Sequence, residues 1–71
     1  MVCYNKLWKL LIDRRMNKTD LRKLVGMSSG SLAKLSKNEP VSMDIILRIC
    51  RALKCDVGDI MEITGSNENN R

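Results

Sequence analysis

The short connection Gly26-Met27-Ser28 constrains this 71-residue chain more than any other feature. Gly26 follows a run with helical spacing of apolar residues, and glycine readily adopts the left-handed conformation that closes a helix. Ser28 can accept an orphan backbone N–H two or three residues on, so it can begin another helix. Only Met27 lies between them. Two helices joined by so short a turn cannot lie antiparallel and must cross steeply, as in a helix-turn-helix.

Two helices are predicted before this turn. Apolar residues recur at helical spacing between Asn5 and Arg15, with Asn5 as a possible N-cap. The next helix is expected from about Lys18 to Val25. Its start carries a weaker version of the capping box, in which Asn17 is the cap and Asp20 stands three residues later.

The helix after the turn is predicted from Ser29 to Lys37, with Leu32 and Leu35 facing inward. It carries almost nothing but small side chains. Pro40 then removes a backbone donor and disfavours helix at the residue before it, so a connection follows.

Ser42 caps a fourth predicted helix, 43–53, and Asp56 caps a short last helix from 57 to about 62. The fourth helix is apolar over a wide arc. One stripe comprises Met43, Ile46, Leu47, Cys50 and Leu53, and a second comprises Ile45, Ile49 and Ala52. The second stripe is either additional core, as expected for Ile49, or a self-association face.

These elements predict an all-α fold, a compact five-helix bundle with a helix-turn-helix. Seventy-one residues suffice for one domain and not for two. We place that domain at residues 1–64. Residues 65–71 are rich in Asn and have no large apolar side chain, so they are expected to be a disordered tail. No strand pattern or repeat is evident.

The three cysteines indicate neither a disulfide framework nor a metal site, since they form no C-x-x-C pair and the chain has no His. Cys50 falls in an apolar helical pattern and is expected to be an inert core thiol. No cofactor is expected. The sequence has no apolar run of membrane-spanning length and no signal-peptide pattern, so we expect a cytoplasmic protein.

Catalysis has little support in this sequence. A general acid or base requires His or paired carboxylates in an apolar setting, whereas the acidic residues here stand at helix caps and first turns. No phosphate-binding loop of the G-x-x-x-x-G-K-[ST] type is present. We therefore expect a protein that is not an enzyme.

Charge is distributed unevenly along the chain. Residues 1–38 hold nine Lys and Arg against two Asp, a net charge of +7, whereas residues 39–71 hold four basic residues against six acidic ones, a net charge of −2. The first half therefore indicates a surface for a polyanion. A solvated basic surface that favours solubility is the competing interpretation of charge alone.

The chain resembles the phage-repressor and Cro-like (XRE-type) helix-turn-helix family, in its short stand-alone branch. The resemblance rests on Asn17-Lys18-Thr19-Asp20-Leu21, on Gly26-Met27-Ser28, on Leu32 and Leu35, and on RICRALKCDVGDIMEI. It covers the chain to about Ile63. It implies a five-helix domain that binds double-stranded DNA, commonly as a dimer, and regulates transcription.

The resemblance further implies that the helix 29–37 enters the major groove. The base-facing residues are then Ser29, Gly30, Ala33 and Lys34, which point outward if Leu32 and Leu35 point inward. The residues implied to contact phosphates are Asn17, Lys18, Arg22, Ser28 and Lys37, near helix N-termini that favour an anion.

The sequence departs from the family pattern at three positions. Arg22 stands where the family usually has Ala at the close approach of the two helices, so its side chain must leave sideways. Leu11 and Ser36 stand where some members place a buried ion pair, which a hydrophobic contact can replace.

Small residues on the base-facing surface would let the helix backbone approach the duplex closely, although Gly30 costs roughly 1 kcal/mol of helix propensity. They also carry little sequence information, so specificity should be modest for each half-site. A homodimer or readout of DNA shape would supply the rest. The competing interpretation of Lys34 and Lys37 is that they are solvated, and Trp8 is expected in the core rather than against a base.

The function predicted from the sequence is a sequence-specific DNA-binding transcriptional regulator that occupies an operator as a homodimer and represses. The alternative is a protein-interaction module, such as an antitoxin-like or anti-repressor partner, that uses the fourth helix.

Overall fold

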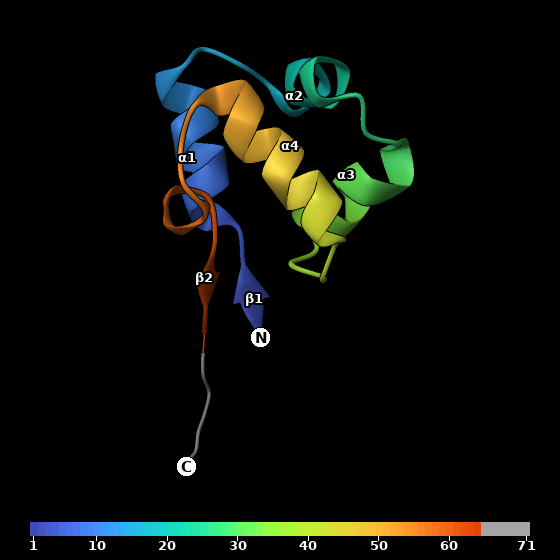
Figure 1. Cartoon of the computed structure of the whole chain (residues 1–71), viewed down its shortest axis with the longest axis vertical. Helices are drawn as coiled ribbons and strands as arrows, with labels where there is room; N and C mark the ends of the chain where they lie inside the picture. Colours follow the sequence, from blue (N-terminus) through green and yellow to red (C-terminus); the bar gives the residue numbers. More distant parts are fainter. Residues whose placement is uncertain (65–71) are drawn as a thin grey trace.

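The computed structural model describes residues 1–64, within which four α-helices form most of the molecule (Figure 1). The elements follow in the order β1 (Val2–Cys3), α1 (Asn5–Asp13), α2 (Lys18–Val25), α3 (Ser29–Ser36), α4 (Met43–Leu53), the 3₁₀ turn η1 (Val57–Asp59) and β2 (Glu62–Ile63). The tail predicted for residues 65–71 lies outside the described part. Among residues 1–64, no helix is both long and apolar enough to cross a membrane.

Local capping fixes the start of α2 in the predicted way. The Asn17 side chain accepts a hydrogen bond from the Asp20 N–H at 2.7 Å, and the Asn17 N–H donates to the Asp20 carboxylate at 3.0 Å. Together these bonds complete a capping box, which satisfies two backbone donors that a helix start leaves free. The predicted ends of α2 and of α4 are confirmed, and α3 ends one residue earlier than predicted.

The start of α1 differs from the prediction. Asn5 is the first helical residue and not the cap; Tyr4 holds the cap position and makes no side-chain capping bond. The Tyr4 N–H donates instead to the side-chain oxygen of Asn38 at 3.1 Å, and the Tyr4 hydroxyl donates to the Glu39 carbonyl at 2.9 Å. Partners 34 and 35 residues away therefore set this helix start, which local sequence rules cannot detect.

The predicted fifth helix, 57–62, is wrong. The segment forms only the 3₁₀ turn η1 and then becomes extended as β2. Strand β2 pairs antiparallel with β1, with Val2 opposite Ile63 and Cys3 opposite Glu62. Two-residue strands carry no alternating pattern, so the absence of a strand signal was misleading. Pairing between the two ends of the described chain gives the backbone hydrogen-bond partners that another helical turn would otherwise have provided.

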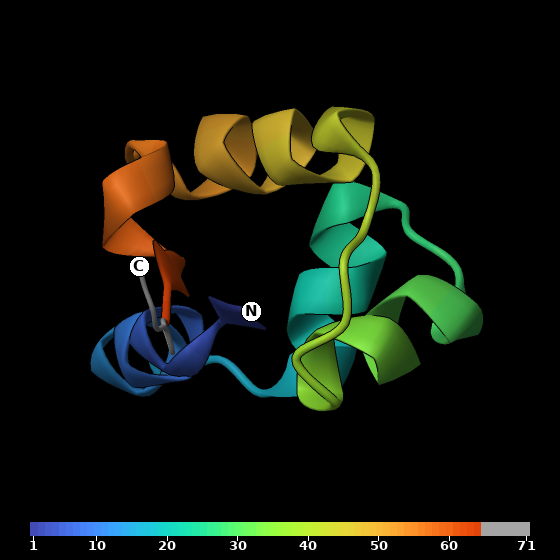
Figure 2. The ribbon, with the colours of Figure 1, turned by 90° about the horizontal axis from the view of Figure 1, so that it is seen from below.

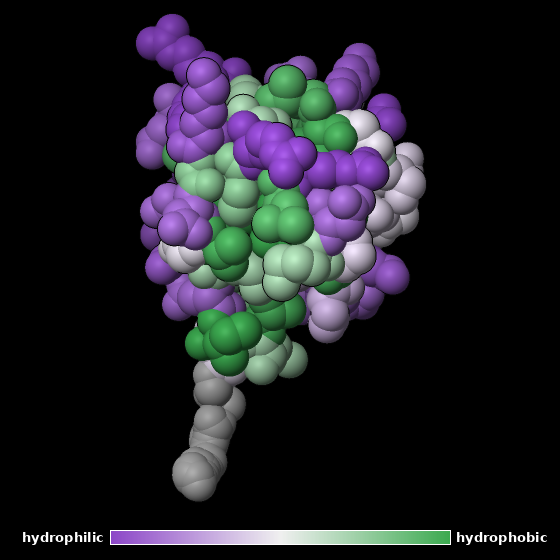
Figure 3. All heavy atoms as spheres, in the orientation of Figure 1, coloured by the Kyte–Doolittle hydropathy of each residue, from purple (hydrophilic) through white to green (hydrophobic). Residues whose placement is uncertain are grey.

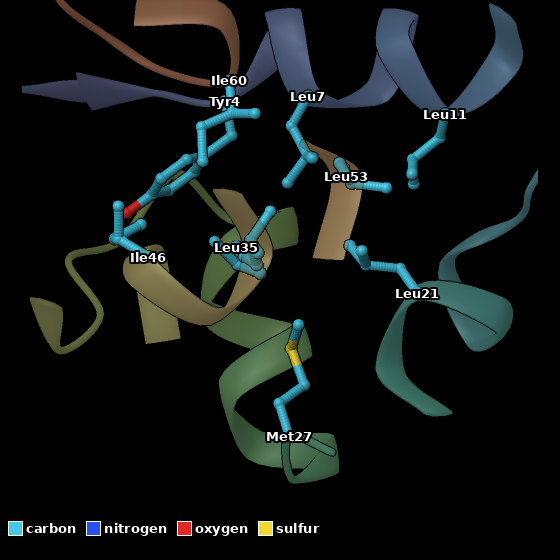
Figure 4. Close-up of a cluster of buried hydrophobic side chains, with 10 residues drawn as sticks. Tyr4, Leu7, Leu11, Leu21, Met27, Leu35, Ile46, Leu53 and Ile60 are labelled. Atoms are coloured by element: carbon cyan, nitrogen blue, oxygen red, sulfur yellow. The ribbon is translucent and has the colours of Figure 1, made fainter. Parts of the chain in front are cut away.

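The core lies where all the helices converge. Figure 2 shows α4 along one side of the molecule, α1 opposite one end of it, and α2 and α3 opposite the other. Among the described residues, the buried side chains are Tyr4, Leu7, Leu11, Leu21, Met27, Leu35, Ile46, Ile49, Leu53 and Ile60, which meet in the centre (Figure 4). All are hydrophobic, so burial of apolar surface is the main stabilising term.

Helix α4 buries a narrower face than its sequence indicated. Ile46, Ile49 and Leu53 are buried, which confirms Ile49 as a core residue. Met43 and Leu47 are 63% and 50% exposed. Helix α4 packs chiefly on α2 and η1, and the edge of its apolar arc that carries Met43 and Leu47 stays uncovered.

Candidate nucleic-acid interface

The turn between α2 and α3 has the conformation that its sequence requires. Gly26 adopts a left-handed conformation with φ of +77°, and its N–H donates to the Arg22 carbonyl at 2.9 Å. Met27 is only 4% exposed and points into the core, as Figure 4 shows. Ser28 then caps α3 by accepting the Ser31 N–H at 3.1 Å. The buried Met27 thus anchors the turn and fixes α3 relative to α2.

The solvent-facing side of helix α3 carries mainly small side chains. The four predicted base-facing residues are all exposed: Ser29, Gly30, Ala33 and Lys34. Leu35 on the opposite side is fully buried and Leu32 is partly buried, so the predicted inward face is confirmed. The outward face carries one amine, one hydroxyl and no bulky side chain.

Nothing in the protein requires glycine at position 30. A Cβ built there would meet only the Ser28 Oγ, at the ordinary contact distance of 3.8 Å. The φ of Gly30 does not lie in the left-handed region, unlike that of Gly26. The fold would therefore accept alanine at this position, and the absence of a side chain has its main consequence for whatever approaches the helix from outside.

The Ser28 hydroxyl is already engaged within the protein. It accepts from the Ser31 N–H and donates to the Ser31 Oγ at 3.2 Å. A ligand at this end of α3 would therefore meet the first-turn backbone N–H groups of Ser29 and Gly30 more readily than the Ser28 hydroxyl. Such groups, together with the helix dipole, favour an anion.

Lys18 is held by contacts that sequence analysis missed. Its ammonium lies 4.4 Å from the centroid of the Trp8 ring and donates to the Ser36 Oγ at 3.1 Å. A cation above an indole face is stabilised by the ring quadrupole. Trp8 is partly buried against the core, so its ring both packs inward and presents a face to Lys18. No sequence signal indicated these contacts, because only the folded chain brings α1 and the end of α3 within reach of Lys18.

The remaining predicted phosphate contacts differ in exposure. Asn17 and Lys37 are exposed and Arg22 is half-buried. The carbonyl oxygen of the Asn17 side chain is used in the capping box, which leaves its amide N–H groups as donors. Lys37 caps the C-terminal end of α3. The nine predicted residues thus lie on or beside α2 and α3, where they are accessible in whole or in part.

Residues 6–66 match the Cro/C1-type HTH DNA-binding domain family. The chain belongs to this family. The family is one of helix-turn-helix DNA-binding domains and not of enzymes, so the chain is assigned DNA binding through its helix-turn-helix. The family resemblance predicted from the sequence is thereby confirmed, and DNA binding is favoured over a module that binds protein alone.

Two relatives illustrate the similarity. The chain is 36% identical over 55 residues to the uncharacterized HTH-type transcriptional regulator YozG of Bacillus subtilis (strain 168), a match that covers 75% of this chain and 66% of YozG. It thus spans slightly less than two thirds of that relative. It is also similar to the crystal structure of the transcriptional regulator VanUg (Form II), with a TM-score of 0.85, 61% identity, and coverage of 86% of this chain and 81% of that one.

Of the two positions at which some family members place a buried ion pair, only that of Leu11 is buried and apolar here. Leu11 is 2% exposed and belongs to the core. Ser36 is exposed and receives the Lys18 ammonium. A hydrophobic contact thus occupies the Leu11 site, which avoids the cost of desolvating two charges.

Cys50 and Cys55 lie together at the end of α4. Lys54 between them is left-handed (φ +54°), and the Cys55 N–H donates to the Cys50 carbonyl at 3.0 Å, a bond typical of a Schellman motif. Burial raises the pKa of both thiols, and the nearby carboxylate of Asp59 acts in the same direction. Cys50 is partly rather than fully buried, and its raised pKa fits the predicted inert thiol.

A metal site has no support in the described part of the chain. Among residues 1–64, no three His, Cys, Asp or Glu side chains come together in a way that could hold a metal ion.

Proposed function

We propose that this regulator is a homodimeric repressor that places α3 in the major groove of a two-fold symmetric operator. The observation that carries the proposal is the exposed, nearly bare outer face of α3 on a rigid turn anchored by Met27. In a helix-turn-helix the N-terminal residues of the second helix contact base edges. The base-facing set is Ser29, Gly30, Ala33 and Lys34.

Lys34 is the main candidate for direct readout. An exposed ammonium on this face can donate to guanine O6 and N7. Ser29 can bond to several bases, and Ala33 can contact a thymine methyl group. One good pair contributes about 1–3 kcal/mol of discrimination against a wrong base.

Phosphate contacts flank the base-facing surface. Lys37 at the C-terminal end of α3, Lys18 bonded to Ser36 at that same end, and the half-buried Arg22 of α2 supply positive charge beside α3. The Asn17 amide and the N-terminal backbone N–H groups after Ser28 add hydrogen-bond donors at helix starts, where the dipole favours an anion. These contacts set the position of the domain on DNA without reading its sequence.

Two copies are part of the proposal because one α3 face offers few sequence-specific donors. A symmetric pair doubles the number of base contacts and adds dependence on half-site spacing and DNA shape. Repression then needs only occupancy of an operator that overlaps a promoter. The names of both relatives, which describe transcriptional regulators, support a regulatory role.

The experiment that tests this function retains sheared genomic DNA of the source organism on the purified protein at near-physiological salt and sequences what stays bound. Enrichment of one shared, roughly two-fold symmetric site near promoters is expected. Retention without a common sequence would reduce the function to backbone binding. No retention would contradict DNA recognition by α3.

The assigned residues are tested by replacing Lys34 and Lys37 together with Ala. Loss of charge contacts should lower affinity for the enriched site and make the slope of log K against log salt shallower by about 1–2, since fewer counterions are released. The matched control is Lys9→Ala with Arg51→Ala, which removes the same charge from exposed positions on α1 and α4. Equal effects of the two double variants would mean that total charge, and not the α3 face, determines binding.

A further inference from the structure

One end of the molecule carries an apolar groove that the helix-turn-helix does not use. It lies between the β1–β2 ribbon, the loop after α3 and the first turn of α4, with a volume of about 370 Å³. Every residue that lines it is hydrophobic or proline. Three other hollows on the described surface each include lysine. In Figure 3, hydrophobic side chains gather over the strands at the lower end of the molecule.

Three large side chains on the groove are left mostly in water: Met1, Met43 and Ile63 are 86%, 63% and 76% exposed. Beneath them, Tyr4 and Ile46 are core residues with at most 3% exposure. The groove is thus an opening onto the core whose edge has no covering element among residues 1–64. Contiguous exposed apolar surface of this kind on a small protein marks an interaction site.

The backbone that carries Met1 and Ile63 is held in place by hydrogen bonds between the two ends of the described chain. The Thr64 N–H donates to the Met1 carbonyl at 2.7 Å, and the Met1 ammonium donates to the Thr64 carbonyl at 3.1 Å. Ile63 pairs with Val2, so the two side chains share one face of the ribbon. Association therefore does not have to order this backbone, and the remaining entropy cost is that of immobilising the exposed side chains, about 0.5–1.5 kcal/mol each.

The occupant of the groove must be apolar and supplied from elsewhere. The segment that continues the chain, GSNENNR, contains no apolar side chain that could fill it. Each copy of the protein offers suitable groups beside its own groove, namely Met1 and Ile63. A two-fold contact brings the same patch of both copies together, so each projecting side chain meets the groove of the other.

The charge distribution also permits a second copy to bind at the groove. Each chain carries a net charge of +5, so contact through the basic surface of α1 to α3 would be opposed by repulsion. No charged side chain lines the groove, and the Met1 ammonium beside it is bonded to the Thr64 carbonyl. On α4 near it, Asp44 and Arg48 neutralise each other in an ion pair of 3.0 Å.

The groove is continuous with the DNA-binding surface. Helix α3 ends at Ser36 with Lys37 as its cap, and Pro40 and Val41 already line the groove. Tyr4, at its floor, bonds to both Asn38 and Glu39 of the intervening loop. The groove is thus rigidly connected to the end of α3, and a two-fold axis through it holds two α3 helices in one fixed arrangement.

We infer that this groove is the self-association surface, filled by Met1 and Ile63 of a second copy. The inference rests on the proposed function, which requires a homodimer, and it adds which surface forms the contact between the two copies. The nine lining residues are fewer than the 20–30 residues a side of a standard interface. The dimer is therefore weak in solution, dissociating at micromolar to millimolar concentration, and DNA that binds both copies strengthens it.

The test compares Met43→Glu with Leu47→Glu. Both replace an exposed apolar residue of α4 with the same charge, and only Met43 lines the groove. Glutamate at Met43, the first residue of α4, also suits the helix dipole, so the fold is retained. Sedimentation equilibrium from about 10 μM to 1 mM, with amide NMR shifts recorded against concentration, gives the association constant and the surface that responds.

The wild-type protein and Leu47→Glu should show a monomer–dimer equilibrium with concentration-dependent shifts confined to β1, β2 and the start of α4. Met43→Glu should weaken association at least tenfold. A wild-type protein that stays monomeric to 1 mM, shifts confined to another surface, or equal effects of the two variants would overturn the inference.

The experiments distinguish failure of self-association through the groove from failure of DNA recognition. Retention of genomic DNA by a strictly monomeric wild-type protein would refute the groove and leave DNA recognition intact. Dimers that form through the groove but retain no DNA would support the groove as the self-association surface and would refute operator binding.

Discussion

At Gly30 the requirements of fold stability and of DNA binding differ. The change Gly30→Ala is expected to raise stability and to lower the affinity for DNA. The new methyl group would lie 3.8 Å from the Ser28 Oγ, and the φ of Gly30 is not left-handed, so no strain is expected. Alanine restricts the unfolded chain and favours helix, which should raise the free energy of unfolding by about 0.5–1 kcal/mol. For a domain of this size that corresponds to a rise in Tm of about 2–8 °C.

The same methyl group should weaken DNA binding. If the α3 backbone approaches the duplex closely at Gly30, an added methyl overpacks that contact. Overpacking costs about 1–3 kcal/mol, or roughly a five- to 150-fold loss of affinity. Thermal unfolding and titration of the enriched operator measure the two effects on one variant. An increase in stability together with a decrease in affinity is the expected combination.

The matched control is Gly58→Ala in η1. Gly58 has no atom within 4 Å of an added Cβ and no left-handed φ, and it lies outside α2 and α3. This variant should not lose affinity. If Gly30→Ala lowered the Tm, the space and conformation assigned to Gly30 would be wrong. If it raised the Tm and left affinity unchanged, the close approach of α3 to DNA would be refuted.

Two further predictions concern stability. Ser28→Ala removes the α3 cap and should lower the free energy of unfolding by about 1 kcal/mol in urea titrations, whereas no loss would show that the Ser31 N–H finds an equally good acceptor. Burial raises the pKa of Tyr4, Cys50 and Cys55, so at alkaline pH these groups ionise first in the unfolded chain. Stability should be complete below the ordinary thiol pKa of about 8.5 and should fall as pH rises through and above it. A urea midpoint that stays constant from about pH 7 to pH 11 would contradict the burial of these groups.

Helix boundaries near the turn could be predicted because their causes are local. The capping box of Asn17 and Asp20, the left-handed Gly26 and the Ser28 cap all act within about four residues of the chain. The burial of Leu35 and the exposure of the opposite face of α3 follow from helical periodicity once the core side is known. The same residues carry the resemblance that indicated the family.

Other features arise from contacts between distant segments. Tyr4 holds the cap position of α1 because Asn38 and Glu39 bind it, and the end of the described chain becomes β2 because β1 lies beside it. Periodicity could not reveal these pairings. The Lys18–Trp8 contact likewise joins α2 to α1 across the fold.

The sequence by itself determined the four main helices, the steep crossing at Gly26-Met27-Ser28 and the basic charge of the first half of the chain, since each depends on neighbouring residues or on composition. Only the tertiary structure decided which apolar residues are covered. Met43 and Ile63 have the same hydrophobic character as buried residues, yet they stay exposed because no element of residues 1–64 packs over them. Burial depends on where other segments lie, and that arrangement is a property of the whole fold.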